Sequence, residues 1–224
     1  MADAIRLTDV RFAWPGATGF ALRIPAFEVA RGERLLLVGP SGGGKSTLLS
    51  LICGTARADA GTVEVMGEGL NGLSGAARDR FRAERIGVIF QMFNLLPYLS
   101  LLDNVLLPLG FAPKRRARAG DAADEAARLL DRLGLEGELL RQPAATLSVG
   151  QQQRAAAARA LIGGPELVVA DEPTSALDSD RRDDFLRLLF EEVERAEATL
   201  LMVSHDPGLG ERFDRVARLD EVVR

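Results

Sequence analysis

The fold of this chain is decided by the stretch Gly39-Pro40-Ser41-Gly42-Gly43-Gly44-Lys45-Ser46-Thr47. It lies between an apolar run of strand length at 35–38 and an apolar run at 48–53 that begins with helical periodicity. The spacing G-x-x-x-x-G-K-S between a strand and a helix predicts a phosphate-binding loop, or P-loop. Glycines let backbone N–H groups close around phosphate oxygens, and the positive end of the next helix faces the same oxygens. A glycine-rich turn with a chance lysine is disfavoured, because both flanking elements are present.

Two side chains of this loop carry specific chemistry. Lys45 is expected to reach the β- and γ-phosphates as a mobile positive charge. The hydroxyl of Ser46 is expected to bind Mg²⁺.

Length and composition predict an ordinary soluble globular protein. The 224 residues suit one large α/β domain or two small ones, with 47% apolar and 27% charged residues. The formal net charge of −4 gives no reason to expect a nucleic-acid partner. Basic clusters at 78–85 and 114–118 are interpreted as a solvated helix face and a solvated loop.

The chain shows no sign of a membrane or secreted location. Cys53 is the only cysteine, which excludes an intrachain disulfide, and we expect it to be a buried core residue. Residues 1–9 show no secretion signal, and no apolar run approaches the roughly 20 residues that span a bilayer. We therefore expect a cytoplasmic protein that works at a membrane only through a partner.

Hydrophobic periodicity predicts an α/β fold with an inserted helical part. Patterns of strand type recur at 5–10, 21–29, 61–67, 86–90, 167–170 and 199–203. Between 92 and 162 the periodicity is mostly helical. We expect a single domain, 1–224, with an α/β core at 1–91 and 163–224 and a helical subdomain at 92–162.

Two carboxylates follow the buried strand predicted at 167–170. Ligands of open α/β sheets gather at the carboxyl ends of strands, where Asp171 and Glu172 stand. Asp171 is suited to hold Mg²⁺ through water, and Glu172 to orient or deprotonate an attacking water. Two solvated acids are the alternative, which the P-loop makes less favourable.

The loop Leu147-Ser148-Val149-Gly150-Gln151 opens another predicted helix. It combines the hydroxyl of Ser148, the unobstructed N–H of Gly150 and a helix N-terminus, which together have the form of a second anion site. A phosphate held from two sides is one interpretation, and a simple N-cap at Ser148 is the other.

Together these motifs resemble the ATP-binding subunit of an ABC transporter, over essentially the whole chain. Residues 39–47 resemble the Walker A loop, 147–151 the family signature LSGGQ, and 167–172 Walker B with the catalytic glutamate. Gln91, Ser175–Asp178 and His205 stand at the positions of the Q-loop glutamine, the D-loop and the switch histidine. Trp14 falls near the adenine-stacking aromatic, and Phe12 is its rival.

The resemblance completes the predicted site. The catalytic residues are Glu172, His205 and Gln91, and the Mg²⁺ ligands are Ser46, Gln91 and Asp171. The nucleotide contacts are Trp14, Gly39, Pro40, Ser41, Gly42, Gly43, Gly44, Lys45, Ser46, Thr47, Ser148, Gly150 and Gln151. One departure is Val149, which replaces the first glycine of the signature and would be disfavoured if that position required positive φ.

The resemblance implies an ATP hydrolase that needs Mg²⁺ and forms a head-to-tail homodimer on ATP binding. The expected fold is a P-loop NTPase core with a mixed sheet, an N-terminal antiparallel β part and the helical insertion. The partner would be a separate integral membrane permease subunit, with the chain peripheral on the inner face of the cytoplasmic membrane, without insertion into it and without nucleic acid. The apolar stretch 92–100 either docks on that partner or packs under the helical subdomain.

Residues 93–97 and 103–109 look most like the branch of lipoprotein-release, macrolide-export and cell-division ATPases. That branch implies export or the transmission of movement across the membrane, although Ser175-Ala176 stands where it often has Gly-Asn. The alternatives are the ATPase subunit of an importer and a soluble ABC ATPase. A P-loop GTPase or small-molecule kinase is disfavoured, because no Asn-Lys-x-Asp motif is present.

Overall fold

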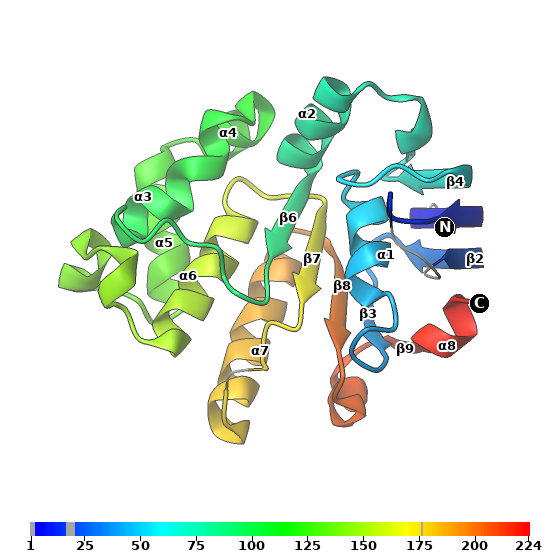
Figure 1. Ribbon diagram of the computed structural model, residues 1–224. Coiled ribbons are helices and arrows are strands. Elements are labelled where there is room, and N and C mark those ends of the chain that lie inside the picture. Colours follow the sequence, from blue (N-terminus) through cyan, green and yellow to red (C-terminus); the bar gives the residue numbers. More distant parts are fainter. Residues whose placement is uncertain (1–2, 17–20, 176) are drawn as a thin grey trace. The chain divides into compact units, whose positions relative to one another are not determined.

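The computed structural model describes residues 3–16, 21–175 and 177–224. It divides into two compact units, one formed by Met1–Arg82 with Thr199–Arg224 and the other by Ala83–Ala198. Figure 1 shows the elements of both units in chain order, and helix α2 (Gly75–Arg85) spans the boundary between them in the sequence.

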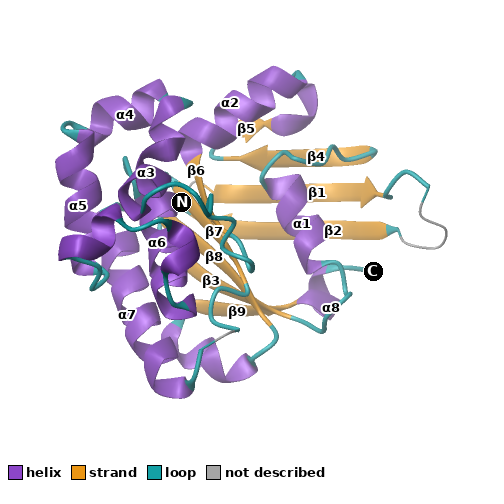
Figure 2. Ribbon diagram, turned by 60° about the vertical axis from the view of Figure 1, so that its left-hand side comes forward, coloured by secondary structure: helices purple, strands orange, loops and turns teal. Residues whose placement is uncertain are grey.

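The first unit contains an antiparallel sheet of order β2-β1-β4-β5. Its strands are β1 (Asp3–Phe12), β2 (Leu22–Ala30), β4 (Ala60–Val65) and β5 (Glu68–Gly69). Ile5 and Leu7 are buried and Arg6 is exposed, the alternation of a half-buried strand, and the strand predicted at 5–10 is confirmed. Helix α1 (Lys45–Ile52) contacts β4, and Figure 2 shows it lying across this sheet.

A bulge in β1 changes which side chains point into the core. Asp9 has φ 49°, and the pairing with β4 shifts between Thr8 and Arg11, so Val10 and Phe12 are buried instead of odd-numbered residues. The bulge requires glycine opposite it, because a Cβ on Gly61 would stand 2.4 Å from the Asp9 carbonyl oxygen. The bulge therefore sets the direction in which the chain leaves β1 toward Trp14.

The other strands of this unit are parallel. β3 (Arg34–Val38) pairs with β8 (Thr199–Ser204) and with β9 (Arg215–Arg218), so that Leu36 faces both Met202 and Val216. Every residue of β8 is buried, as its continuous apolar sequence predicts. The short helices η1 (Leu70–Gly72), η5 (Pro207–Arg212) and α8 (Leu219–Val222) complete the unit.

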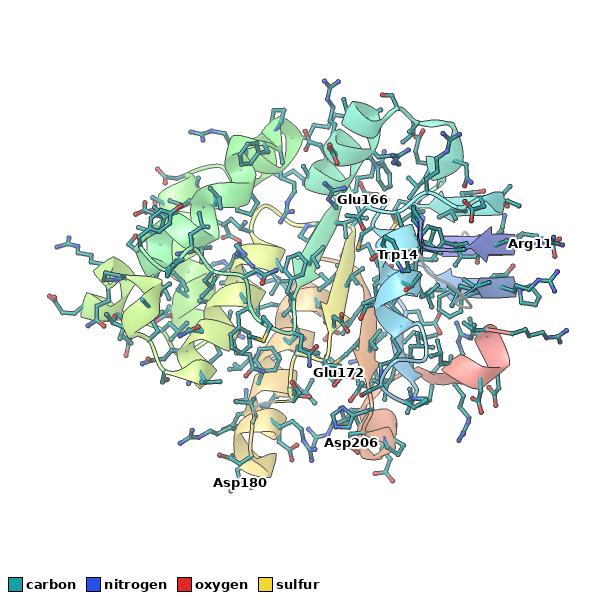
Figure 3. The ribbon with its side chains drawn as sticks, in the orientation of Figure 1. Arg11, Trp14, Glu166, Glu172, Asp180 and Asp206 are labelled. Atoms are coloured by element: carbon teal, nitrogen blue, oxygen red, sulfur yellow. The ribbon has the colours of Figure 1, made fainter. Side chains whose placement is uncertain are left out.

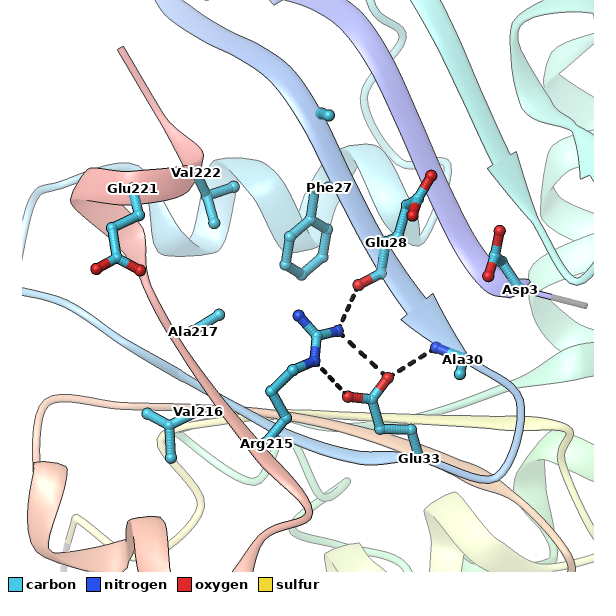
Figure 4. A pocket seen from close by; sticks show the side chains of 11 residues that line it. Asp3, Phe27, Glu28, Ala30, Glu33, Arg215, Val216, Ala217, Glu221 and Val222 are labelled. Atoms are coloured by element: carbon cyan, nitrogen blue, oxygen red, sulfur yellow. Dashed lines mark hydrogen bonds and ion pairs between the residues drawn. The ribbon is translucent and has the colours of Figure 1, made fainter. Parts of the chain in front are cut away.

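An ion pair between Arg215 of β9 and Glu33, in the turn after β2, lies at the wall of a cavity of about 690 Å³ (Figure 4). Arg215 Nε donates to Glu33 Oε1 at 2.6 Å, and Arg215 Nη2 donates to the Glu28 carbonyl oxygen at 2.6 Å. Glu33 Oε2 also accepts from the Ala30 N–H at 2.7 Å. These polar groups hold the turn between β2 and β3, which leads into the P-loop strand.

The second unit combines two parallel strands with most of the helices. β6 (Ile86–Ile89) pairs with β7 (Leu167–Asp171), with Val88 opposite Val169. Helices α3 (Leu101–Leu106), α5 (Ala122–Arg132) and α6 (Val149–Leu161) pack on one another, and α6 also contacts β6 and α7 (Ser179–Arg195). The remaining helices are α4 (Pro113–Ala119), η2 (Leu107–Gly110), η3 (Gly137–Arg141) and η4 (Ala144–Thr146).

The interpretation of residues 114–118 as a solvated loop is wrong. They lie in α4, and Arg115 is 2% exposed. Its guanidinium donates to the backbone carbonyl oxygens of Ala83, Ile86, Ala160 and Ile162. Burial lowers the Arg115 pKa to about 10, which leaves the group charged at neutral pH. A buried charge persists here because its donors meet carbonyl oxygens from three other segments of the chain.

The architecture confirms the predicted α/β class, with an antiparallel part and a parallel part. Strand β9 was not predicted, because its four residues Arg-Val-Ala-Arg carry no strand-length apolar run. Cys53 is buried at the end of α1, as expected. None of the helices in the described ranges is long and apolar enough to cross a membrane.

Candidate functional site

The P-loop joins β3 to α1 in the first unit, and its glycines serve two purposes. Gly42 and Gly44 have φ of 78° and 104°, a left-handed backbone that side chains rarely adopt. Gly39 and Gly43 pack against Leu219 of α8, since an added Cβ would lie 2.6 Å and 2.8 Å from its side chain. The loop therefore bends sharply and stays close to α8, as a phosphate cradle requires.

Lys45 is held against the loop it belongs to. Its ammonium donates to the carbonyl oxygens of Gly39 at 2.6 Å and Pro40 at 3.0 Å, and the residue is 6% exposed. Ser46, the next residue of α1, is exposed. The loop thus carries a positive charge at its base and an exposed hydroxyl at the helix start, two groups of the kind that can contact a polyphosphate and its cation.

Trp14 lies beside the end of this loop (Figure 3). Its Nε1 donates to the Thr47 hydroxyl at 3.2 Å, and its ring stands edge-on to Phe12 with centroids 4.9 Å apart and planes at 87°. Trp14 is 44% exposed, whereas Phe12 is 6% exposed. Of the two aromatic candidates, Trp14 therefore has a ring surface that a base can reach, and Phe12 belongs to the core.

His205 follows β8 directly and is exposed. The residue before it, Ser204, accepts a hydrogen bond from the Gly39 N–H at 3.3 Å through its carbonyl oxygen. The Ser204 hydroxyl also accepts from the Asp206 N–H at 3.0 Å. Hydrogen bonds therefore fix the backbone on both sides of His205, and one of them comes from Gly39, the first residue of the P-loop.

In the second unit, Asp171 and Glu172 stand at the carboxyl end of β7 and are half-buried, with Glu172 labelled in Figure 3. Glu172 has φ 46°, and its carbonyl oxygen accepts from the Ser175 N–H at 3.3 Å. Of the predicted D-loop, Ala176 lies outside the described residues. Asp178 caps α7 by accepting from the Arg181 N–H at 3.0 Å.

The signature loop starts α6 with a capping box. The Ser148 hydroxyl accepts from the Gln151 N–H at 3.4 Å, and Gln151 Oε1 accepts from the Ser148 N–H at 2.8 Å. Ser148 is therefore an N-cap, and it is also exposed. Val149 is the first residue of α6 and has no positive φ, which explains why valine is tolerated where the family has glycine.

Gln91 is exposed, two residues after the end of β6. Two and three residues further on, Phe93 and Asn94 have φ of 59° and 51°. Their carbonyl oxygens both accept from the guanidinium of Arg159 on α6, which is 7% exposed and whose pKa is lowered by that burial. Sequence reasoning missed Arg159, because the alanine-rich segment around it was assessed for helix propensity alone.

The apolar stretch 92–100 is ordered by Asn104, which is fully buried. The Asn104 amide accepts from the Leu96 N–H at 2.8 Å and donates to the carbonyl oxygens of Leu96 and Ser100, each at 3.0 Å. Met92 and Tyr98 are nevertheless 80% and 74% exposed. The stretch is thus a fixed loop with large apolar side chains on its outside.

Each unit brings together part of the predicted site. The first holds the P-loop, Trp14 and His205, and the second holds Gln91, the signature loop, Asp171 and Glu172. In the parts of the chain that the structure describes, no group of three or more His, Cys, Asp or Glu side chains could hold a metal ion.

Fold and site define a P-loop nucleotide-binding protein of the α/β class. The family model described as "ABC transporter" matches residues 22–175, and the chain belongs to this family. It is accordingly an ATP-binding, ATP-hydrolysing transporter subunit.

Relatives and solved structures agree with this assignment. The chain is 41% identical to the lipoprotein-releasing system ATP-binding protein LolD of Hydrogenovibrio crunogenus, over 87% of this chain and 83% of the relative. It is 46% identical to LolD of Anaeromyxobacter dehalogenans, over 85% and 79%. The ATP-binding cassette MJ0796, solved as a post-hydrolysis dimer with ADP and phosphate, is similar with TM-score 0.80 and 32% identity, covering 96% of this chain and 93% of that one.

Proposed function

We propose that two copies of this chain bind ATP head-to-tail and drive a separate membrane subunit in export or in transmitting movement across the membrane. Each ATP would lie between the P-loop of one copy and Ser148 with Gly150 of the other. The observation that carries this proposal is the presence, in one chain, of a P-loop and of a separate helix start whose N-cap Ser148 is exposed. An isologous dimer forms two such sites at once.

The P-loop would bind the phosphates through its N–H groups and through Lys45, which is already held against the loop by Gly39 and Pro40. The fit is supported by the left-handed backbone of Gly42 and Gly44, which lets N–H groups converge without a Cβ between them. ATP would complete the site by bringing its adenine to the exposed ring of Trp14.

Magnesium would be held by Ser46, Asp171 and Gln91. These residues suit Mg²⁺, because it is usually bound by few protein oxygens together with substrate phosphates and water, and Ser46 and Gln91 are exposed. When bound, Mg²⁺ would neutralise charge on the β- and γ-phosphate oxygens.

Hydrolysis would depend on Glu172 and His205. Glu172 would orient the attacking water and accept its proton, while His205 would hold the γ-phosphate and that water in line. The opposing Ser148 and Gly150 would complete the site only in the dimer, so that ATP favours the closed state and hydrolysis releases it.

The part 92–162 would act as a helical subdomain carried by the core at 1–91 and 163–224, with Gln91 at the junction. Its loop 92–100 would dock on the membrane subunit through Met92 and Tyr98, whose exposure supports a partner surface. This would make the protein peripheral on the inner face of the cytoplasmic membrane. The similarity to proteins named lipoprotein-releasing supports an exporter-type or mechanotransmitting complex.

The test uses the Glu172→Gln protein, loaded with ATP, as bait in solubilised membranes, with the Lys45→Ala, Glu172→Gln protein as the matched control. Recovery, by the ATP-loaded bait alone, of a four-helix membrane protein with a large extracytoplasmic domain would support the proposal. A many-helix permease with a solute-binding protein would replace it by import. The absence of any membrane protein would contradict the proposed docking on a membrane subunit.

A further inference from the structure

The turn that follows Glu172 has a backbone that needs outside support. Glu172 is not glycine, and its φ of 46° lies in the left-handed region. Such a conformation persists only where neighbouring groups hold it, since relaxation to negative φ lowers the energy of the residue itself. The direction of the Glu172 carboxylate therefore depends on what fixes the backbone on either side.

Gln153 supplies that support from α6. Its Nε2 donates to the carbonyl oxygen of Pro173, the residue directly after Glu172. The amide orientation is unambiguous, because a carbonyl oxygen can only accept a hydrogen bond. Both residues are buried, and Gln153 is 0% exposed, so water does not compete for the bond.

The oxygen of the same amide indicates which of its two polar groups is important. Gln153 Oε1 is buried and has no hydrogen-bond partner among the described residues. Gln153 lines a cavity of about 330 Å³ together with Ser148 and Gly150 of the signature loop. A buried polar atom without a partner is unfavourable, and an apolar side chain of the same size would avoid it. The glutamine therefore serves through the hydrogen bond that it donates.

We propose that Gln153 is a positioning residue for the catalytic glutamate. Helix α6 is a single element of 13 residues that carries the signature loop at its capped start and Gln153 within its first two turns. If ATP binding displaces the signature end of α6, the displacement is passed to the turn at Pro173 through the hydrogen bond that Gln153 donates. This inference rests on the proposed role of Glu172 in orienting the attacking water.

The proposal predicts a change in rate without a change in substrate affinity. Without the bond, the turn relaxes and the carboxylate moves away from its place. A misplacement of about 1 Å at a reacting group can cost about 100-fold in rate. Gln153→Met should therefore lower kcat by about 10- to 100-fold and leave KM for ATP unchanged, since the P-loop is untouched.

A matched control is Gln152→Met, the same substitution at the neighbouring position. This substitution also removes one hydrogen bond to the backbone, which Gln152 Nε2 donates to the Leu147 carbonyl oxygen at 2.9 Å. That bond is not made to the turn at Pro173. Its kcat should stay within about 3-fold of the parent chain. An equal loss in both variants would mean that α6 is merely destabilised, and would overturn the inference.

Gln153→Glu adds a second measurement, the pH dependence of kcat, which should stay unchanged if Gln153 only stabilises the fold. The new carboxyl keeps the shape, and in its protonated form its O–H can still donate to Pro173. Burial raises the pKa of a carboxyl, so the ratio of its kcat to that of the parent chain should fall as pH rises from about 6 to about 8.5. The ratio for Gln153→Met should stay constant over the same range. A pH-independent ratio for both variants would refute the positioning role.

Glu172→Gln, measured in parallel, separates the proposed role of Glu172 from the proposed role of Gln153. If this variant hydrolyses ATP at the parent rate, the proposed role of Glu172 fails and the inference falls with it. If it is inactive while Gln153→Met keeps the parent kcat, only the inference fails. Binding of Mg-ATP by each variant confirms that the protein is folded, and Gln153→Glu at low pH serves if Gln153→Met does not fold.

Discussion

Replacing Trp14 with alanine tests whether the exposed indole is the platform for adenine. Base–aromatic stacking contributes about 1–3 kcal/mol per base, so Trp14→Ala should raise Kd for ATP by about 5- to 150-fold. Trp14 is 44% exposed, so a large part of its ring can contact a base. Its edge contact with Phe12 and the hydrogen bond from its Nε1 to Thr47 fix the plane of the indole.

The same substitution should cost little stability. It removes one edge-to-face pair, worth about 0.5–1.5 kcal/mol, and one hydrogen bond, worth about 0.5–1.5 kcal/mol. Most domains tolerate a loss of about 1–3 kcal/mol and stay folded. The urea midpoint of Trp14→Ala should therefore fall modestly, without loss of the folded state at room temperature.

The assay compares ATP with inorganic tripolyphosphate by isothermal titration calorimetry. Tripolyphosphate lacks the base, so its affinity should be the same for the parent chain and for Trp14→Ala. Trp14→Phe should keep most of the ATP affinity, because the phenyl ring still stacks after the bond to Thr47 is lost. In the parent chain Trp14 is the only tryptophan, so its fluorescence should change on ATP binding. An equal loss of affinity for both ligands would show that Trp14 only supports the loop.

Other substitutions probe the loop and the two buried arginines. Lys45→Ala should abolish ATP hydrolysis in a phosphate-release assay, and normal turnover would remove Lys45 from the site. Arg115→Met should lower the free energy of unfolding by about 1–3 kcal/mol in urea titration, because buried carbonyl oxygens lose their hydrogen-bond donor. Arg159→Met should speed hydrogen exchange at residues 91–96, since the left-handed turn at Phe93 and Asn94 loses its support. Unchanged exchange there would contradict the role given to Arg159.

Local patterns explain why much of the fold was predictable. Within nine residues, the glycines and the lysine of the P-loop predict a backbone conformation and the position of a charge. Apolar runs such as 199–203 predict buried strands. Strand β9 escaped prediction because four residues that begin and end with arginine give no such run. The bulge at Asp9 was also not predicted, since it depends on the glycine that faces it from β4.

Three buried polar residues that hold backbone segments in place could not be found from sequence patterns. Arg115, Gln153 and Arg159 act on carbonyl oxygens 20 to 66 residues away in the chain. Composition predicts such residues on the surface, and only the tertiary structure shows the acceptors that make their burial favourable. Likewise the sequence could not decide whether Val149 fits the signature loop, because the sign of its φ follows from the start of α6.

ATP-dependent dimerisation is tested most directly by the mass of the Glu172→Gln protein in solution with Mg-ATP, measured by size-exclusion chromatography with light scattering. We expect a dimer of two 24.1 kDa chains with ATP and a monomer with ADP, because in the proposed dimer only the intact triphosphate holds the opposing signature loop. Adding Lys45→Ala should restore the monomer. A protein that binds ATP and still runs as a monomer would contradict the claim that ATP is held between two copies of this chain.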